Sequence, residues 1–201
     1  MLNHPIVEAS FSIIDREVGN HNLTEDEYQI ARRVIHATAD FDYLKLLQFR
    51  DNAIASGIRG IQQQVPIVTD VTMVRQGIGS MVAKTFGNEI ITAVEQAKVA
   101  ELGKTRTETG LLKCWDKYPE AIYVIGNAPT ALLALCDRIS QTQITPTLVI
   151  GVPVGFVSVI ESKQTLSQLN IPQILTEGRK GGSAVAAAIV NALCILAWEN
   201  Q

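Results

Sequence analysis

Short apolar runs that end at small or polar residues recur along the chain, and they constrain its fold more than any other feature. The four clearest runs are residues 65–69, 121–125, 147–150 and 171–175. They are continuously apolar rather than alternating, as expected of parallel strands that are covered on both faces. Pro172 lies inside the last run, so we expect that strand to be weak or to lie at an edge of the sheet.

Helical patterns lie between these runs. Thr24 to Glu27 fit a capping box, in which the threonine hydroxyl and the glutamate carboxylate satisfy free amides, and this predicts a helix to about Ala39. Ser183 is a candidate cap for the last helix. Further helical patterns occur at 130–136, 161–169 and 183–198. Repeated strand, loop and helix predict a single α/β domain over residues 1–201, with a mostly parallel sheet flanked by helices. Ligands of such sheets bind beyond the carboxyl ends of the strands.

Composition and charge exclude several classes of protein. Seventeen Lys and Arg stand against 20 Asp and Glu, so no general basic field would attract nucleic acid. The three cysteines are far apart and form no C-x-x-C motif, which predicts free thiols in a reduced, cytoplasmic compartment. The first residues carry no pattern of a secretory signal. The apolar segment 184–198 is too short for a membrane span, and it predicts a buried helix.

Two glycine-rich segments could approach phosphate or carboxylate groups. Residues 77–82 lack the third glycine of a dinucleotide-binding loop, and residues 178–183 lack the spacing of a phosphate-binding P-loop. The second segment still has free glycine amides, the cations Arg179 and Lys180, and a helix start after it, which together suit an anion. The alternative is a tight turn into an alanine-rich helix.

His36 is the most informative ionisable residue. It shares a helix face with Arg32 and Arg33, whose charges disfavour a charged imidazole, and Asp40 would offset them if the helix continues that far. A histidine beside arginines suits an acid that acts on an anionic substrate. The alternative is a half-buried helical histidine with solvated arginine neighbours. We find no metal-ligand spacing and no nucleophile motif in the sequence.

Seven groups of residues, in order along the chain, together resemble the precorrin-8X and cobalt-precorrin-8 methylmutases of corrin (cobalamin) biosynthesis. Each group alone is weak evidence, but their common order is specific, and they cover the chain from His4 to about Leu196. The groups are residues 4–6 with 10–15, 33–41, 70–74, 105–107, 126–132, 151–158 with 161–163, and 178–183 with 190–193.

The resemblance implies an isomerase that needs no cofactor and no external methyl donor. The family moves a methyl group from C-11 to C-12 of precorrin-8X, or of its cobalt form, by a 1,5-sigmatropic shift that gives hydrogenobyrinate or cobyrinate. The resemblance implies that His36 protonates the nitrogen of ring C. It also implies an α/β fold and a homodimer that holds the tetrapyrrole near the subunit interface.

The rim of such a tetrapyrrole carries several carboxylates, which need cations and hydrogen-bond donors. The candidate substrate-binding residues are Ser10, Arg33, Arg106, Asn127, Lys163 and Arg179. Arg106 and Lys163 are equally compatible with solvated side chains. Two other functions stay open: a tetrapyrrole-binding homologue without catalysis, and a nucleotide-dependent enzyme, which the incomplete glycine motifs disfavour. The sequence does not distinguish a cobalt-free substrate from a cobalt-bound one.

Overall fold

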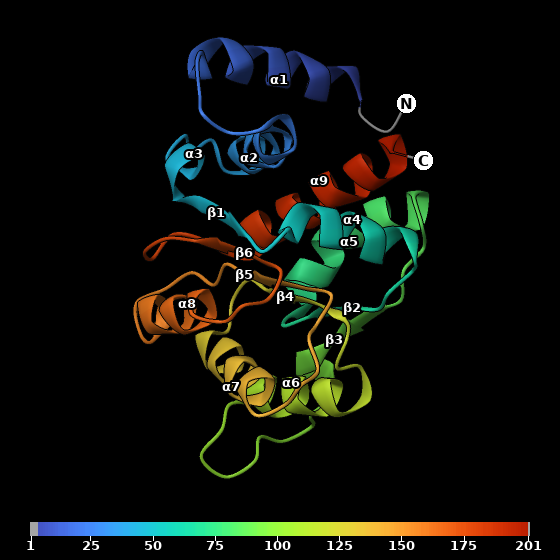
Figure 1. Cartoon of the computed structure of the whole chain (residues 1–201), viewed down its shortest axis with the longest axis vertical. Helices are drawn as coiled ribbons and strands as arrows, with labels where there is room; N and C mark the ends of the chain where they lie inside the picture. Colours follow the sequence, from blue (N-terminus) through green and yellow to red (C-terminus); the bar gives the residue numbers. More distant parts are fainter. Residues whose placement is uncertain (1–3, 201) are drawn as a thin grey trace.

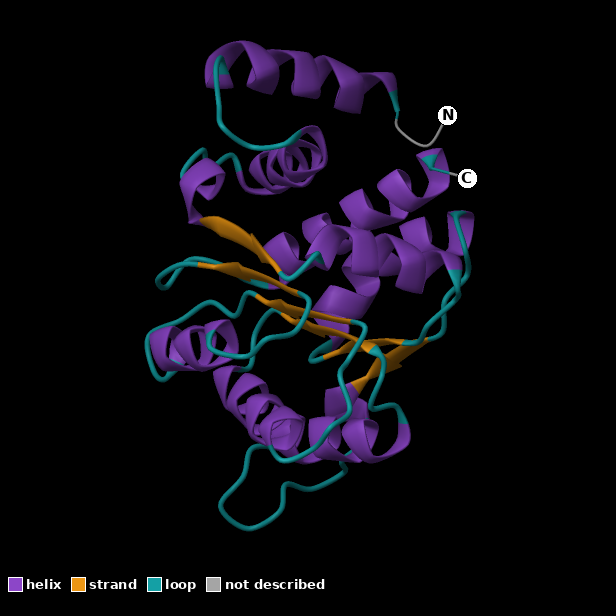
Figure 2. Cartoon of the chain, in the orientation of Figure 1, coloured by secondary structure: helices purple, strands orange, loops and turns teal. Residues whose placement is uncertain are grey.

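The computed structural model describes residues 4–200 and contains a six-stranded sheet with helices on both faces (Figures 1 and 2). The strand order is β1-β6-β5-β4-β2-β3. Strands β2 to β6 are parallel to one another, and β1 is antiparallel to β6. This confirms the predicted α/β fold with a mostly parallel sheet. The strands are β1 (Leu47–Arg50), β2 (Ile67–Thr69), β3 (Ile90–Thr92), β4 (Ile122–Ile125), β5 (Leu148–Gly151) and β6 (Gln173–Thr176).

The helices form layers on either side of this sheet. Figure 1 shows α4, α5 and α9 on one face and α6, α7 and α8 on the other. Helix α2 packs on α9, and α1 packs on α2 as the outermost layer. The helices are α1 (Pro5–Val18), α2 (Glu25–Thr38), α3 (Tyr43–Leu46), α4 (Ala53–Gln62), α5 (Thr72–Lys84), α6 (Arg106–Lys117), α7 (Pro129–Ser140), α8 (Val159–Ser167) and α9 (Ser183–Glu199), with the short 3₁₀ helix η1 (Ala93–Glu95).

The predicted capping box is present at the start of α2. Thr24 Oγ1 accepts from the amide of Glu27, whose carboxylate accepts from the amide of Thr24 at 2.8 Å. Ala39 adopts a left-handed conformation with φ of 54° and ends the helix. The helix thus ends at Thr38, within one residue of the predicted end near Ala39, and Asp40 lies outside it.

The position of Pro172 corrects one expectation. Strand β6 lies between β1 and β5, so it is not at an edge of the sheet. Pro172 immediately precedes the strand, and its carbonyl accepts from the amide of Val149 at 3.0 Å. Pro172 has no amide hydrogen to donate, but it lies before the residues of β6 that pair with β1, so this pairing loses no hydrogen bond.

Two expectations about glycine and serine are also wrong. Residues 77–82 are not a loop but part of α5, where a Cβ on Gly77 would lie only 2.7 Å from Cβ of Ala187 in α9. Glycine therefore allows these two helices to approach closely. Ser183 is the first residue of α9, and Gly182 is its cap.

Helix α9 is buried within this chain, as its alanine-rich sequence allows, and it contacts α2, α4 and α5. All three cysteines are buried free thiols, as predicted. No helix within residues 4–200 is long and apolar enough to cross a membrane. The first three residues, where the prediction of no secretory signal partly falls, lie outside the described residues.

The antiparallel strand β1 determines where His36 lies relative to the sheet. Leu47, at the start of β1, pairs with Thr176, at the end of β6. The segment that precedes β1 therefore lies at the edge where the parallel strands end, which we call the carboxyl edge. The end of α2 and the loops that follow β4, β5 and β6 meet at this edge.

Candidate active site

His36 lies in the last turn of α2, and its side chain is exposed. Its ring meets the ring of Phe11 from α1 edge-on, with 5.5 Å between the centroids. Asp40, which the sequence suggested could offset the arginine charges, is paired with a lysine of another loop. Its carboxylate accepts from Lys180 Nζ at 2.7 Å, and this bond holds the pKa of Asp40 below its usual value. The imidazole is therefore supported on one side and open to a ligand.

The two arginines beside His36 have different environments. Arg32 donates to Asp15 Oδ2 at 3.0 Å, and its guanidinium lies 4.4 Å from the centroid of the Phe11 ring. Arg33 is half-buried and lines a hollow of about 180 Å³ between α1, α2 and α9. Burial, and then the charge of Arg32, lowers the pKa of Arg33. Arg32 thus ties α2 to α1, whereas Arg33 lines a space one turn from His36.

Arg179 lies in the loop between β6 and α9, and its side chain is exposed. Its guanidinium lies 5.6 Å from the ring centroid of Phe156, in the loop after β5. Phe156 and Val157 are both 84% exposed. Nζ of Lys180, the next residue, donates to the carboxylate of Asp40 and, at 2.6 Å, to Oδ2 of Asp42. The guanidinium of Arg179, the exposed apolar side chains of Phe156 and Val157, and the end of α2 therefore lie together at the carboxyl edge.

Asn127 and Arg106 lie farther along the same edge. The exposed Asn127 follows β4, and Arg106 is the exposed first residue of α6. The capping residue Thr105 places its hydroxyl 3.1 Å from the hydroxyl of Thr130 in α7, which joins the starts of these two helices. Adjacent strands are about 4.8 Å apart, so the ends of β6 and β4 are about 10 Å apart. The predicted residues thus form an extended row rather than one compact cluster.

The side chains of Ser10 and Lys163 both hydrogen-bond to groups of the protein itself. Ser10 Oγ donates to the carbonyl of Ile6 at 2.9 Å, and the hydroxyl keeps its acceptor capacity. Lys163 is 3% exposed, and burial lowers its pKa to about 8. Its ammonium lies beneath the loop that carries Arg179 rather than on the surface.

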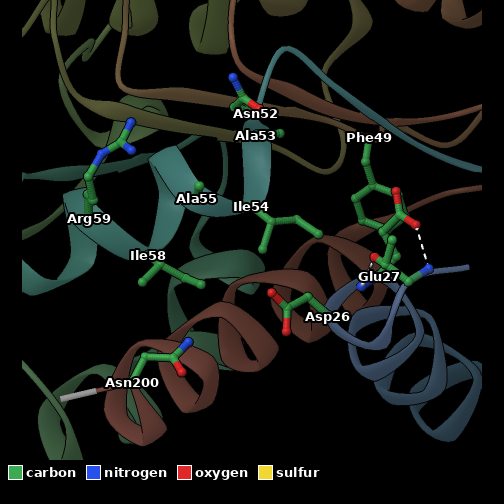
Figure 3. Close-up of a pocket in the computed structure, with 11 residues that line it drawn as sticks. Asp26, Glu27, Phe49, Asn52, Ala53, Ile54, Ala55, Ile58, Arg59 and Asn200 are labelled. Atoms are coloured by element: carbon green, nitrogen blue, oxygen red, sulfur yellow. Dashed lines mark hydrogen bonds between the residues drawn. The ribbon is translucent and has the colours of Figure 1, made fainter.

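The hollow in Figure 3 lies away from these residues. It has a volume of about 600 Å³ and is formed by the start of α2, the end of β1, helix α4 and Asn200 after α9. Apolar side chains such as Ile54 and Ile58 line it together with Asp26. The hollow lies at the start of α2 and the end of α9. His36 is in the last turn of α2 and Ser183 is the first residue of α9, so both are at the helix ends away from the hollow. We therefore place the candidate active site at the carboxyl edge and not in this hollow.

Comparison with known proteins identifies the family. The family model described as precorrin-8X methylmutase matches residues 5–196. The chain belongs to the precorrin-8X methylmutase family. The chain is 56% identical to the cobalt-precorrin-8 methylmutase of Synechocystis sp., over 99% of this chain and 98% of that one. The corresponding protein of Leptospira interrogans is 42% identical, over 99% of this chain and 96% of its own length.

A solved structure supports the same assignment. The precorrin-8X methylmutase of Thermus thermophilus superposes with a TM-score of 0.89 at 40% identity, over 97% of this chain and 96% of that one. As a member of this methylmutase family, the protein is an isomerase of cobalamin biosynthesis. The resemblance seen in the sequence is thereby confirmed.

Sequence reasoning did not identify Asp70 as the residue that holds the loop carrying Asn127. Asp70 follows β2 and is completely buried. Its Oδ2 accepts from the amides of Asn127 and Ala128 at 2.6 and 2.9 Å, and its Oδ1 accepts from the amide of Val71 at 2.9 Å. Burial raises the pKa of Asp70, and the backbone hydrogen bonds oppose this shift. The sequence shows an aspartate directly after an apolar run, within the matched group 70–74, but two of its three donors are 57 and 58 residues away.

Proposed function

We propose that this protein moves a methyl group from C-11 to C-12 of precorrin-8X or of cobalt-precorrin-8, giving hydrogenobyrinate or cobyrinate. The carrying observation is the exposed His36 at the carboxyl edge, which Asp40 and Lys180 join to the loop that bears Arg179. Relatives of this chain bear the names of both the cobalt and the cobalt-free enzymes. Both substrates therefore belong to the proposal.

In the proposed mechanism, His36 donates a proton to the nitrogen of ring C, and the migrating methyl group stays on the macrocycle. Because substrate and product are isomers, the macrocycle releases a proton after the shift, which restores the charged imidazole. The carbon–methyl bond at C-11 breaks as the bond at C-12 forms, so no external donor is consumed. Placing one proton on a correctly held conformer accounts for the acceleration. The support from this chain is the open side of the imidazole, with Phe11 behind it.

We propose that the rim carboxylates of the tetrapyrrole are bound along the carboxyl edge. The exposed cation of Arg179 lies beside Phe156, so a charged rim and an apolar macrocycle face would both find a matching surface. Arg33 lines the hollow between α1, α2 and α9, and Ser10 lies in α1 next to Phe11, whose ring contacts His36. Arg106 and Asn127 lie on the β4 side, about two strand spacings from β6.

The proposed activity is tested by mixing the purified protein with precorrin-8X and, separately, with cobalt-precorrin-8. The methyl shift changes the conjugation of the macrocycle, so we expect a change in its absorption spectrum with at least one substrate. The preferred substrate is the one with the higher kcat/KM. Binding of the product without any spectral conversion of either substrate would instead indicate a non-catalytic tetrapyrrole-binding homologue.

We also propose that the protein is a cytoplasmic homodimer in which the tetrapyrrole lies near the subunit interface. Three free cysteines fit a reduced compartment. Exposed apolar side chains at the carboxyl edge, among them Met73, Phe156 and Val157, fit a surface that a second subunit and the ligand cover together.

Light scattering after gel filtration checks the oligomeric state. We expect a mass twice that of the 21.9 kDa chain at micromolar concentration. A charge introduced at the apolar surface by Val157→Asp should shift the protein toward the monomer, because burying an unpaired charge is costly. Glu120→Lys, an exposed change at the opposite edge of the sheet, is the control. A monomer in the wild type would contradict the proposed dimer.

A further inference from the structure

The ammonium of Lys163 is fully engaged by its own protein. It lies in α8, and Nζ donates to Thr176 Oγ1 at 2.9 Å, to the carbonyl of Gly178 at 3.0 Å and to the carbonyl of Lys180 at 2.7 Å. An ammonium has three hydrogens to donate, so all three are used. A buried cation that meets only neutral acceptors is costly to maintain. This cost favours a specific role over a passive place in the core.

The three acceptors all belong to the segment that carries Arg179. Thr176 ends β6, and the carbonyls of Gly178 and Lys180 flank Arg179 in the sequence. Thr176 Oγ1 also donates to the carbonyl of Lys180 at 2.8 Å. Because both flanking carbonyls point inward to one ammonium, the backbone at Arg179 is fixed on both sides while its side chain is exposed.

Further contacts hold the other side of the same loop. The side chain of Lys180 bonds to Asp40 and Asp42, and the amide of Gly182 donates to the carbonyl of Val152 at 2.8 Å. A Cβ on Gly181 would lie 2.3 Å from that same carbonyl oxygen, so the backbone closely approaches the residue that follows β5. The loop is therefore held between α8, the segment after β5 and the segment after α2.

We infer that Lys163 is a positioning residue, which fixes the loop of residues 177–182 so that Arg179 meets a rim carboxylate, and that it does not contact the tetrapyrrole itself. This inference rests on the proposed function only for the role of Arg179. It replaces the expectation that Lys163 binds the substrate directly. A positioning residue and a direct ligand contact differ in how substitutions at Lys163 and Arg179 combine in their effect on ligand affinity.

The experiment is a double-mutant cycle with Lys163→Met and Arg179→Ala, using hydrogenobyrinate as the probe ligand. Each single variant should weaken binding about tenfold, measured by titration of the macrocycle absorption. The double variant should bind no more weakly than Arg179→Ala alone, because an unfixed loop has no further effect once the guanidinium is absent. Lys163→Arg, which keeps charge and donors, should recover most of the affinity.

Hydrogen exchange supplies a readout that does not depend on the ligand. In the free protein, Lys163→Met should raise exchange at the amides of residues 178–182 at least tenfold, while the amides of β4 keep their protection. Lys84→Met, an exposed change at the end of α5, is the matched control and should alter neither measurement. If Lys163→Met does not fold, Thr176→Val, which removes one acceptor of the ammonium, takes its place in both measurements.

Two results would overturn the inference. Additive losses in the cycle would mean that Lys163 contacts the ligand independently, and unchanged exchange in the loop would mean that it does not fix the backbone. Unchanged affinity in Arg179→Ala alone has a different meaning. It would remove Arg179 from the proposed rim contacts, while the exchange experiment would still decide whether Lys163 fixes the loop.

Discussion

Replacing His36 with alanine is expected to lower the turnover of this methylmutase by about 10²- to 10⁴-fold, the usual contribution of a positioned acid. The reason is that no other imidazole of the described chain lies at the carboxyl edge: His4 caps α1, and His21 stacks on Tyr28. Affinity for the product should change little, because the rim contacts remain. Single-turnover absorption kinetics and a separate binding titration measure the two effects.

The fold should tolerate this change at His36. Its side chain is exposed, its described ring contact is with Phe11, and alanine has a higher helix propensity than histidine. His21→Ala serves as the control and should retain full turnover, since His21 lies at the other end of α2. Wild-type turnover in His36→Ala would refute the proton-donor role, whereas loss of both turnover and product binding would indicate damage to the site as a whole.

Asp70→Asn is expected to lower the free energy of unfolding by about 2–5 kcal/mol, more than any other substitution proposed here. The carboxylate accepts from three backbone amides, and two of these belong to the loop that carries Asn127. An asparagine has one acceptor oxygen, and its amino group would face a buried amide donor. The removed desolvation cost of the charge offsets part of this loss, because burial disfavours the carboxylate form.

Urea denaturation followed by circular dichroism measures the effect of Asp70→Asn. The midpoint should fall while the dependence of the free energy on urea concentration stays constant. Asp116→Asn, an exposed change on α6, is the matched control and should stay within about 0.5 kcal/mol of the wild type. A stability loss of similar size in both variants, or in neither, would contradict the role assigned to the buried carboxylate.

The parts of the fold that local sequence determines were predictable. The capping box at Thr24 predicted the start of α2, and four apolar runs predicted β2, β4, β5 and β6. The other two strands were missed for physical reasons. β1 includes the polar residues Gln48 and Arg50 and is only partly buried, and the apolar part of β3 is limited to Ile90 and Ile91, so neither produces a clear apolar run. Gly77 suggested a loop because its role depends on Ala187, which is distant in sequence.

The candidate site was less predictable because its contacts join distant parts of the chain. The sequence placed Arg32 beside His36, but it gave no sign that Asp15 on another helix pairs with that arginine. Lys163 looked like a surface cation, and only the fold brings three carbonyl and hydroxyl oxygens to its ammonium. Residue type and spacing thus suggested which residues matter, whereas their roles depend on long-range packing.

The pairing of β1 with β6 affects how this protein folds while the ribosome synthesises it. Gln48 and Glu177, which are hydrogen-bonded across these strands, are 129 positions apart in the sequence. On the ribosome, the segment with the imidazole emerges long before its partner strand exists, and contacts of such high sequence separation form late. A nascent chain therefore cannot form this strand pairing, or the candidate site beside it, until β6 has been synthesised.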